Sequence, residues 1–540
     1  MIGRRYAWLL PGAVTAALGV PALVAASGAT TSTTPRAAFT APARADRAEK
    51  TSGQNEPQVA VARNGTAFVT WQSGAKGSDV SKTRNGKKFT YLGYPDPATP
   101  DSGLGTGDVG DVTEATAVGT GAVFWGNLGQ GGTTCGETPI QIRNAVTLNG
   151  KKFTRQATAG CEPAQIDRPW LAAYTPPSAR GTKGAAAHTR LYYEYHDFGA
   201  SNIWVETSTD GGKSWPTSPV SAVQAGSPQA LTSTCNTIPG GIAVAQTGKH
   251  AGRVYAVWET SDLHENLVQG CDYSQAEAFD HIFLSYSDDG GQTWTSSTVF
   301  NDPCDPNPPV PPADPTACQD VSEIFSSIAV DRAGNVYVAY VRRNVADKKP
   351  EYDIYVAASR NGGKSFVSRK ASTDTGTHYE PWIAAGGRGG VDVVFYDTRF
   401  VDGVGELNKP AAAPATAKWT VQMSQSLDGG RTWRQSNVSR RPVYFGDICS
   451  TGIFCGLAPP GSNWGNDRTL FDDFGVAVGP DGGARIAWTD AHASWTKTCK
   501  PGGDITCQTT HVDFACQTSG RGVGGQIIDG CGKTGPKRKR

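Results

Sequence analysis

Arginine and acidic residues recur where short apolar segments of this sequence begin or end, and such side chains can do acid–base chemistry around an anionic group. Arg168 stands in the run Asp167-Arg168-Pro169-Trp170, and Arg399 follows Tyr396-Asp397-Thr398. A guanidinium is a planar fork that matches a carboxylate, and nearby carboxyl groups can donate or accept protons. The arginine candidates are Arg168, Arg342, Arg343, Arg399 and Arg468, and the acidic candidates are Glu56, Asp197, Glu259, Glu380, Asp397, Asp472, Asp473 and Asp490.

A structural role is the alternative for most of these candidates. Asp397 occupies the same repeat position as Asp197, where a carboxylate can simply tie the end of a strand. Glu380 and Glu56 both precede a proline in equivalent segments, which is also part of the repeat pattern. Arg168 holds that position in another repeat and departs from the pattern. It is therefore the best single candidate for a functional residue.

The elements that carry these residues are organised around a repeated turn, S-x-D-G-G-x-S/T-aromatic. Asp or Asn can hydrogen-bond to its own backbone, Gly permits the positive φ of a tight turn, and the aromatic ring can pack beneath it. Repetition of such a turn at intervals of tens of residues predicts a repeat fold. Copies occur at 208–215, 287–294 and 426–433, with an Asn variant at 359–366 and shorter relatives at 85–89 and 149–153.

This turn motif resembles the Asp-box, or BNR repeat, of sialidases and related secreted β-propellers. The resemblance extends from about Glu56 to Cys516 and implies a β-propeller fold. In that family the Asp-box is a turn motif and does not carry the catalytic residues. The repeats therefore predict the fold more strongly than they predict the chemistry.

Pairs of short apolar strands precede the turns and define the repeat unit. The first strand reads P-x-h-A-V, and the second ends in an aromatic residue, as in 57–61 and 67–71. Four antiparallel strands per unit make a propeller blade. We predict an all-β propeller with Asp-box hairpins and favour seven blades, with six, the number in sialidases, as the alternative. The strand pairs begin near residues 57, 114, 169, 241, 327, 381 and 474.

The long connections are all predicted on one face of the propeller. Strand direction alternates within a blade, so the turns described above share one face, and the other connections lie on the opposite face. Long loops on one face of a rigid scaffold favour a binding site there, although they could also only cap the channel. The connections are 216–235, 300–322, 436–471, 262–280, 400–416 and 493–510.

The sialidase resemblance implies roles for the candidates. Sialidases bind the substrate carboxylate with three arginines, use a Tyr–Glu pair as nucleophile and use an Asp as acid/base. The implied substrate-binding residues are Arg168, Arg399, Arg343 and Arg468; the implied catalytic residues are Tyr396 with Glu380 or Glu259, and Asp397 or Asp473 as acid/base.

We therefore expect a secreted exo-α-sialidase-like glycosidase that acts on terminal acidic sugars of glycoconjugates. Two alternatives remain at this stage. One is a non-catalytic propeller that binds glycan or protein through its looped face, and the other is a glycosidase of neutral polysaccharide. The sequence contains no G-x-S-x-G, H-E-x-x-H or P-loop motif, so no other strong enzymatic signature competes with these.

The N-terminal sequence predicts that the protein is exported from the cell. A basic start, an apolar run and small residues indicate a signal peptide over 1–29, of the Sec or twin-arginine type. Residues 30–54 are expected to be flexible, 55–531 to form the propeller, and 532–540 to be a basic tail. No other apolar run is long enough to span a bilayer, so we expect no stable membrane insertion.

The charge balance limits the classes of partner that we expect, and the cysteine content predicts disulfides. The chain has 50 Lys plus Arg and 49 Asp plus Glu, which argues against nucleic acid, and we expect a monomer that binds glycan. No cofactor or metal is expected, since a Ca²⁺ site near Asp302, Asp305 and Asp314 lacks an evenly spaced ligand pattern. Twelve cysteines without C-x-x-C spacing predict disulfides. The expected pairs are 135–161, 235–271, 304–318, 449–455, 499–507 and 516–531.

Overall fold

A computed structural model of the chain describes most residues between 36 and 531. All of them belong to the compact unit that begins at Pro35. The predicted leader 1–29 and basic tail 532–540 lie outside the described residues. The described ranges are 36–49, 53–73, 77–96, 108–130, 140–163, 165–197, 202–216, 218–233, 237–260, 279, 281–302, 319–320, 325–344, 351–400, 413–448, 469–470 and 474–531.

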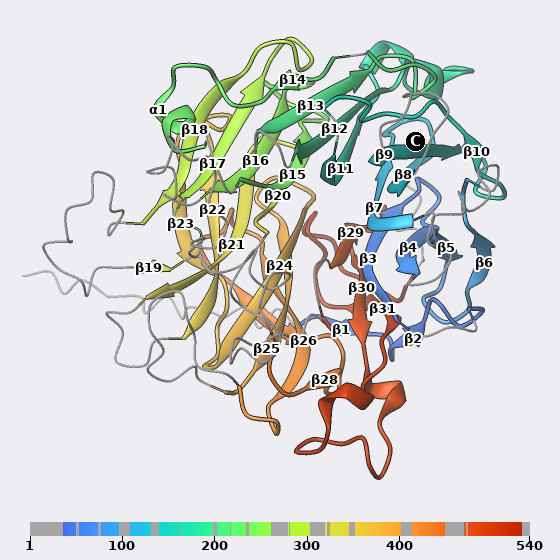
Figure 1. Cartoon of the computed structure of the whole chain (residues 1–540), viewed down its shortest axis with the longest axis vertical. Helices are drawn as coiled ribbons and strands as arrows, with labels where there is room; N and C mark the ends of the chain where they lie inside the picture. The colour runs from blue at the N-terminus through green and yellow to red at the C-terminus, as the bar shows by residue number, and fades with distance from the viewer. Residues whose placement is uncertain are drawn as a thin grey trace, which may run out of the picture. The chain divides into compact units, whose positions relative to one another are not determined.

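The described strands form seven antiparallel sheets, which we number as blades in chain order (Figure 1). Blade 1 contains β3 (Gln54–Val61), β4 (Ala67–Ser73), β5 (Gly77–Thr83) and β6 (Thr90–Gly93). Blade 2 contains β7 (Asp108–Thr116), β8 (Val123–Gln130), β9 (Ile140–Thr147) and β10 (Thr154–Arg155). Blade 3 contains β11 (Ile166–Tyr174), β12 (Arg190–Asp197), β13 (Ile203–Ser208) and β14 (Val220–Ser221).

The remaining blades follow the same order. Blade 4 contains β15 (Ile238–Val244), β16 (Val254–Thr260), β17 (His281–Ser287) and β18 (Thr295–Asn301). Blade 5 contains β20 (Ser327–Val330), β21 (Val336–Asn344), β22 (Tyr352–Ser359) and β23 (Val367–Lys370), with β19 (Gln319–Asp320) added to β21. Blade 6 contains β24 (Thr377–Ala385), β25 (Val391–Thr398), β26 (Lys418–Ser426) and β27 (Arg434–Asn437), with β28 (Tyr444–Phe445) added to β26. Blade 7 contains β29 (Gly475–Val478), β30 (Ala484–Asp490) and β31 (His511–Ser519).

The first strand of each blade lies innermost, and these strands close a ring. Neighbouring members of the series β3, β7, β11, β15, β20, β24 and β29 contact each other, and β29 contacts β3. The chain is therefore an all-β, seven-bladed β-propeller, as predicted. Helical residues in the described part are confined to short segments. These are α1 (Pro228–Thr232) and 3₁₀ turns at Pro177–Ala179, Ala185–His188, His492–Ser494 and Ile505–Cys507.

The core lies between adjacent blades, because strand side chains alternate between the two faces of each sheet. The aromatic residues predicted at the end of each second strand fill these junctions. Trp71, Trp125, Trp258 and Trp488 are fully buried. The Trp125 Nε1 group also donates a 3.1 Å hydrogen bond to Thr70 Oγ1 of blade 1. Each such ring removes enough apolar surface from water to stabilise the fold by about 2–3 kcal/mol.

The N-terminal residues 36–49 complete blade 7, although residues 30–54 were expected to be flexible. β1 (Ala38–Phe39) and β2 (Ala43–Arg44) both pair with β31, and Figure 1 shows β2 beside β31. The Phe39 side chain is buried in the core. This pairing supplies the outer strands that blade 7 lacks, so the first part of the described chain joins its last blade.

The four complete copies of the repeated turn share one hydrogen-bond pattern. In the copy at 287–294, Ser287 Oγ donates to Asp289 Oδ1 at 2.8 Å and accepts from Gly291 N at 2.8 Å. Thr293 donates to the same Asp289 carboxylate through its backbone N at 2.9 Å and its Oγ1 at 2.6 Å. Asn361 replaces the Asp in blade 5 and still accepts from Ser359 Oγ at 2.8 Å.

These turns lie on the same face as the turns between the first two strands of each blade. For example, Gly429 N donates to Gly389 O at 2.9 Å, which joins the two kinds of turn in blade 6. The starts of the first strands and the ends of the second strands therefore lie on the opposite face, as predicted. Of the long connections predicted for that face, 493–510 and most of 216–235 are described, whereas most of 262–280, 300–322 and 400–416 lies outside the described residues.

Two of the predicted disulfides are present in the described part of the chain, Cys499–Cys507 and Cys516–Cys531. Cys161 is also disulfide-bonded, and its predicted partner Cys135 lies outside the described residues. Both cysteines of each of the predicted pairs 235–271, 304–318 and 449–455 lie outside the described residues. Among the described residues, no helix has the length and apolar character needed for a membrane span.

Candidate active site

Three innermost strands carry the same irregularity on the face opposite the turns. The pairing of β3, β11 and β24 with the next strand shifts register at Glu56, Arg168 and Glu380. Each residue precedes a proline, which has no N–H for the ladder, so pairing must break there. Their φ angles are 49°, 54° and 54°, a left-handed backbone that is unfavourable for any residue with a Cβ. Such strain concentrates at functional sites, so these residues mark a candidate site.

The side chain of Arg168 reaches residues from distant blades inside the ring. Its Nη1 lies 3.9 Å from Glu56 Oε2 of blade 1, and its Cζ lies 4.5 Å from the ring centroid of Phe325, just before β20 of blade 5. Arg168 and Glu56 are each only 7% exposed. Because blades 1, 3 and 5 are not neighbours, these contacts lie in the channel and not between two packed blades.

Aromatic rings from opposite blades meet beside this charged pair. Trp170 and Trp382 stand two residues after Arg168 and Glu380, and their ring centroids are 5.0 Å apart. Trp170 also lies 6.1 Å from Phe325. Since equivalent residues of blades 3 and 6 meet, Glu380 lies at the same level of the channel as Arg168. The site therefore combines two carboxyl groups, one guanidinium and an aromatic wall.

Burial also acts on two further acids near the innermost strands. Glu194 stands opposite Trp170 in the strand ladder, and burial raises the pKa of its carboxyl group well above the ordinary value, although a backbone hydrogen bond with Gly241 lowers it. Burial likewise raises the pKa of Glu114 on β7, although a backbone hydrogen bond with Ala60 lowers it. Burial thus favours the neutral form of both carboxyl groups. Sequence reasoning missed them, although a Glu inside an apolar strand could have drawn attention.

Tyr396 is fully buried between blades 6 and 7. Its hydroxyl donates to Thr489 O at 3.2 Å and accepts from Thr489 N at 3.1 Å, and its ring packs 4.2 Å from Phe474. Burial, and next the charge of Glu380, raise the pKa of Tyr396 well above 10. This environment favours a structural role for Tyr396, and its role as the nucleophile stays a prediction.

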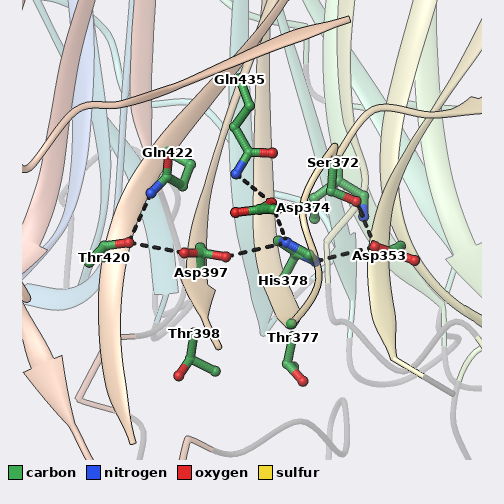
Figure 2. A network of polar contacts seen from close by, with 12 residues as sticks. Asp353, Ser372, Asp374, Thr377, His378, Asp397, Thr398, Thr420, Gln422 and Gln435 are labelled. Carbon is green, nitrogen blue, oxygen red and sulfur yellow. Dashed lines mark hydrogen bonds and ion pairs between the residues drawn. The ribbon is translucent and has the colours of Figure 1, made fainter. Parts of the chain in front are cut away.

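His378 and three carboxyl groups form a cluster where blade 6 meets blade 5 (Figure 2). His378 Nδ1 lies 3.0 Å from Tyr352 O and 3.3 Å from Asp353 Oδ1. Its Nε2 lies 3.2 Å from Asp374 Oδ1 and 3.3 Å from Asp397 Oδ1. Burial alone would lower the pKa of His378, but the hydrogen bonds with Asp353, Asp374 and Asp397 raise it well above 6.5. This cluster therefore gathers one imidazole and three carboxyl groups where blades 5 and 6 meet.

The cluster contains one predicted residue, Asp397, whose acid/base role stays a prediction. Sequence reasoning missed Asp353, Asp374 and His378. They come from different strands and from the connection 371–376, so their spacing in the sequence does not show that they meet. Asp374 comes within reach of His378 because residues 371–376 form a short link between blade 5 and blade 6.

The other predicted residues that the structure describes have different surroundings. Arg343 is buried, and its guanidinium lies 5.5 Å from the ring of Tyr352. Glu259 is buried within blade 4, opposite Ile238 and Ile282. Arg399 is exposed at the end of β25. Arg468 and Asp473 lie outside the described residues. The three-arginine arrangement of sialidases is thus not assembled by the described residues.

Comparison with known proteins does not assign the chain to a family. No family model matches it, and no curated protein matches it. Solved structures to which it is similar include propellers that act as a polysaccharide lyase, an arabinanase and a sialidase. Membership of the sialidase family is not shown by these comparisons.

The similarities to solved structures are distant. An ulvan lyase is 12% identical with a TM-score of 0.44 and covers 84% of this chain and 93% of its own. The α-L-arabinanase of Penicillium chrysogenum is 10% identical with a TM-score of 0.38 and covers 89% and 98%. A Hadza microbial sialidase is 12% identical with a TM-score of 0.34 and covers 86% and 65%. All three TM-scores are below 0.5.

Proposed function

We propose that this protein is a secreted glycosidase whose substrate enters the propeller channel on the face opposite the turns. One observation carries the proposal. Glu56, Arg168 and Glu380 occupy the same strained position in three blades, and Arg168 contacts Glu56 across the channel. The strain is maintained at charged residues, which is typical of positions held for function.

The residue types suit cleavage of a glycosidic bond. Most glycosidases use two carboxyl groups, one to protonate the leaving oxygen and one to act as base or nucleophile. Glu380 and Glu56 are the pair that we assign to these two roles. Trp170 and Trp382 offer apolar faces that can pack against a sugar ring.

Arg168 supports the finer proposal that the terminal sugar is acidic, as in a sialidase-type reaction. Its guanidinium already lies against a carboxylate and an aromatic ring in the absence of substrate. A substrate carboxylate could take the place of Glu56 and make a charge-assisted contact that orients the sugar. A glycosidase of neutral polysaccharide would instead leave the Arg168–Glu56 pair intact during the reaction.

The disulfides support secretion. Cys499–Cys507 and Cys516–Cys531 form in the described part of the chain, and disulfides persist in oxidising compartments outside the cytosol.

The test is a turnover assay on the purified chain with fluorogenic sialosides and with neutral and acidic polysaccharides, followed by release of aglycone or of reducing ends. Arg168→Ala should reduce turnover of an acidic substrate by about 100-fold or more, because a charged contact is lost. Arg431→Ala, which changes an exposed arginine in a turn on the other face, is the matched control and should match the wild type.

Three outcomes separate the proposals. Turnover of sialosides that depends on Arg168 supports the sialidase-type reaction. Turnover of neutral polysaccharide alone supports a glycosidase but overturns the acidic substrate. Binding on a glycan array without any turnover by folded protein overturns the enzyme and leaves a glycan-binding propeller.

A further inference from the structure

A second set of residues, separate from the channel residues Glu56, Arg168 and Glu380, has the donor atoms of a metal site. Asp374, His378 and Asp397 each offer one ligand atom, and these atoms all lie within 4.8 Å of one another. Figure 2 shows the two carboxylates converging on the same edge of the His378 ring. They come from the link before β24, from β24 itself and from β25, so rigid strands hold two of the three.

The distances fit a tetrahedral ion. His378 Nε2 lies 3.2 Å from Asp374 Oδ1 and 3.3 Å from Asp397 Oδ1. Zinc bonds of about 2.0–2.2 Å at tetrahedral angles separate neighbouring ligand atoms by roughly 3.3–3.5 Å. The two nitrogen–oxygen distances are therefore close to two edges of a zinc coordination tetrahedron, and the two carboxylate oxygens lie within 4.8 Å of each other.

One carboxylate oxygen in this cluster points to a missing ligand. Asp397 is only 6% exposed, and among the described residues its buried Oδ1 has only His378 Nε2, at 3.3 Å, as a polar contact. A single N–H on His378 Nε2 cannot point at both Asp374 and Asp397, although both oxygens lie beside it. A buried carboxylate oxygen left in this state is costly, and an ion bound to all three ligands removes the cost.

The charges of the cluster also favour a dication. Lys370 Nζ lies 2.5 Å from Asp353 Oδ2 and 3.4 Å from Glu351 Oε1, so these three groups carry one net negative charge. A protonated His378 between Asp374 and Asp397 leaves one further net negative charge. A dication with neutral His378 brings the sum over Asp374, His378 and Asp397 to zero, and the proton displaced from Nε2 passes to solvent.

Neighbouring groups hold the three ligands in the orientation that metal ligands usually have. The other ring nitrogen, Nδ1, lies 3.0 Å from Tyr352 O, and a hydrogen bond to a backbone carbonyl fixes the tautomer that leaves Nε2 for the metal. Thr420 Oγ1 donates to Asp397 Oδ2 at 3.1 Å, and Gln435 Nε2 donates to Asp374 Oδ1 at 2.6 Å.

We propose that Asp374, His378 Nε2 and Asp397 bind one divalent cation of the zinc class, with water as the fourth ligand. The mixed imidazole and carboxylate set suits Zn²⁺ better than Ca²⁺ or Mg²⁺, which take oxygen ligands. Asp374 is the ligand with an exposed side chain, at 49%, so the ion enters from its side. The site ties the start of β24, which carries Glu380, to β25 and to the link from blade 5.

The test uses the full chain after removal of metal with a chelator. Zn²⁺ is added, excess is removed, and bound metal is measured by elemental analysis, while Co²⁺ is added in parallel to record tetrahedral absorption bands. We expect about one Zn²⁺ per chain and a higher Tm with Zn²⁺. Asp374→Asn changes the exposed ligand, so this variant should fold, and it should weaken Zn²⁺ binding by about 100-fold or more. His378→Gln should abolish binding if the variant folds.

Asp504→Asn is the control, because it changes an exposed aspartate in a loop without these neighbours. It should bind Zn²⁺ like the wild type. The proposal is overturned if the wild type retains no more Zn²⁺ than Asp374→Asn, or if a parallel sample given Ca²⁺ retains that ion while the sample given Zn²⁺ does not retain zinc. These readouts do not depend on glycan turnover, so failure here is distinguishable from failure of the proposed enzyme.

Discussion

At the scale of single residues, the unusual feature of this propeller is a charged side chain on a left-handed backbone before proline. Glu56, Arg168 and Glu380 share it. A residue selected only for stability at such a position would be glycine, which has no Cβ to clash. The retention of charge there is the physical reason to place function in the channel.

A matched pair of substitutions measures this strain. Arg168→Gly and Arg168→Ala remove the same contacts, but only glycine accepts a φ of 54° without a clash. We expect the glycine variant to be more stable than the alanine variant by about 1 kcal/mol, with both inactive. Urea unfolding measures the difference. Equal stability of the two variants, or greater stability of the alanine variant, would show that the backbone at residue 168 is not strained.

At this scale the sequence pointed to part of the candidate site. Arg168 stood out because it departs from a repeat position that Glu56 and Glu380 fill, and repetition makes a departure visible. His378 and Asp374 did not stand out, because their meeting depends on a link between blades that has no repeated pattern. Tyr396 was the predicted nucleophile, and the structure buries its hydroxyl against blade 7, where it donates to Thr489 O.

At the scale of elements, the repeated turn is held by a side chain that replaces backbone hydrogen bonds. Burial tends to raise the pKa of the Asp289 carboxyl group, but hydrogen bonds from Thr293, Ser287 and Gln292 lower this pKa to about 2. The carboxylate therefore stabilises the turn at neutral pH, and this contribution is lost as the pH falls from about 4 toward 2.

Substitutions at Asp289 test which property the turn needs. Asp289→Ala removes the acceptor of several hydrogen bonds and should lower stability by about 1 kcal/mol. Asp289→Asn should cost less, because Asn361 fills the same place in blade 5 and accepts from Ser365 N at 3.1 Å. Thermal unfolding at pH 7 compares the two. An Asn variant as unstable as the Ala variant would show that charge, and not hydrogen bonding, holds the turn.

A buried acid between blades predicts a pH-dependent stability. Glu206 on β13 accepts from Gly160 N at 2.6 Å, and burial raises the pKa of its carboxyl group from 4.5 to about 7. The folded state thus holds a proton that the unfolded state releases. This stabilisation is present below about pH 4.5 and is lost as the pH rises to about 7, a loss of about 3 kcal/mol.

Glu206→Gln should remove that dependence, because the amide stays neutral and keeps an acceptor for Gly160. We expect a higher Tm than wild type at pH 8 and little change at pH 4.5. Glu162→Gln, at an exposed position, is the control and should follow the wild type at both values. A variant that is less stable than wild type at pH 8 would contradict the assignment of a buried, proton-holding Glu206.

At the scale of the whole molecule, the ring is closed by the two ends of the described chain. β1 and β2 pair with β31, and Asp46 accepts from Arg44 Nε at 3.0 Å and lies 3.2 Å from His511 Nδ1. The number of blades could be predicted, because each strand pair repeats a recognisable pattern. The closure could not, because β1 and β2 are too short to show any alternation.

Removal of the N-terminal strands tests the closure. A chain that begins at residue 50 lacks β1, β2 and the buried Phe39, whose side chain alone contributes about 2–3 kcal/mol. We expect a clearly lower Tm than for a chain that begins at residue 36, which serves as the control. Equal Tm values for the two chains would show that blade 7 is stable without its N-terminal strands.

The central claim is that the channel residues perform the chemistry, and Glu380 tests it most directly. The measurement is the initial rate of glycan cleavage by Glu380→Gln beside the wild type, with Tm measured on the same samples. Removal of a catalytic carboxyl group should lower kcat by about 100-fold or more with the fold retained. A rate within about twofold of wild type, in a variant that remains folded, would contradict the claim and place the chemistry elsewhere.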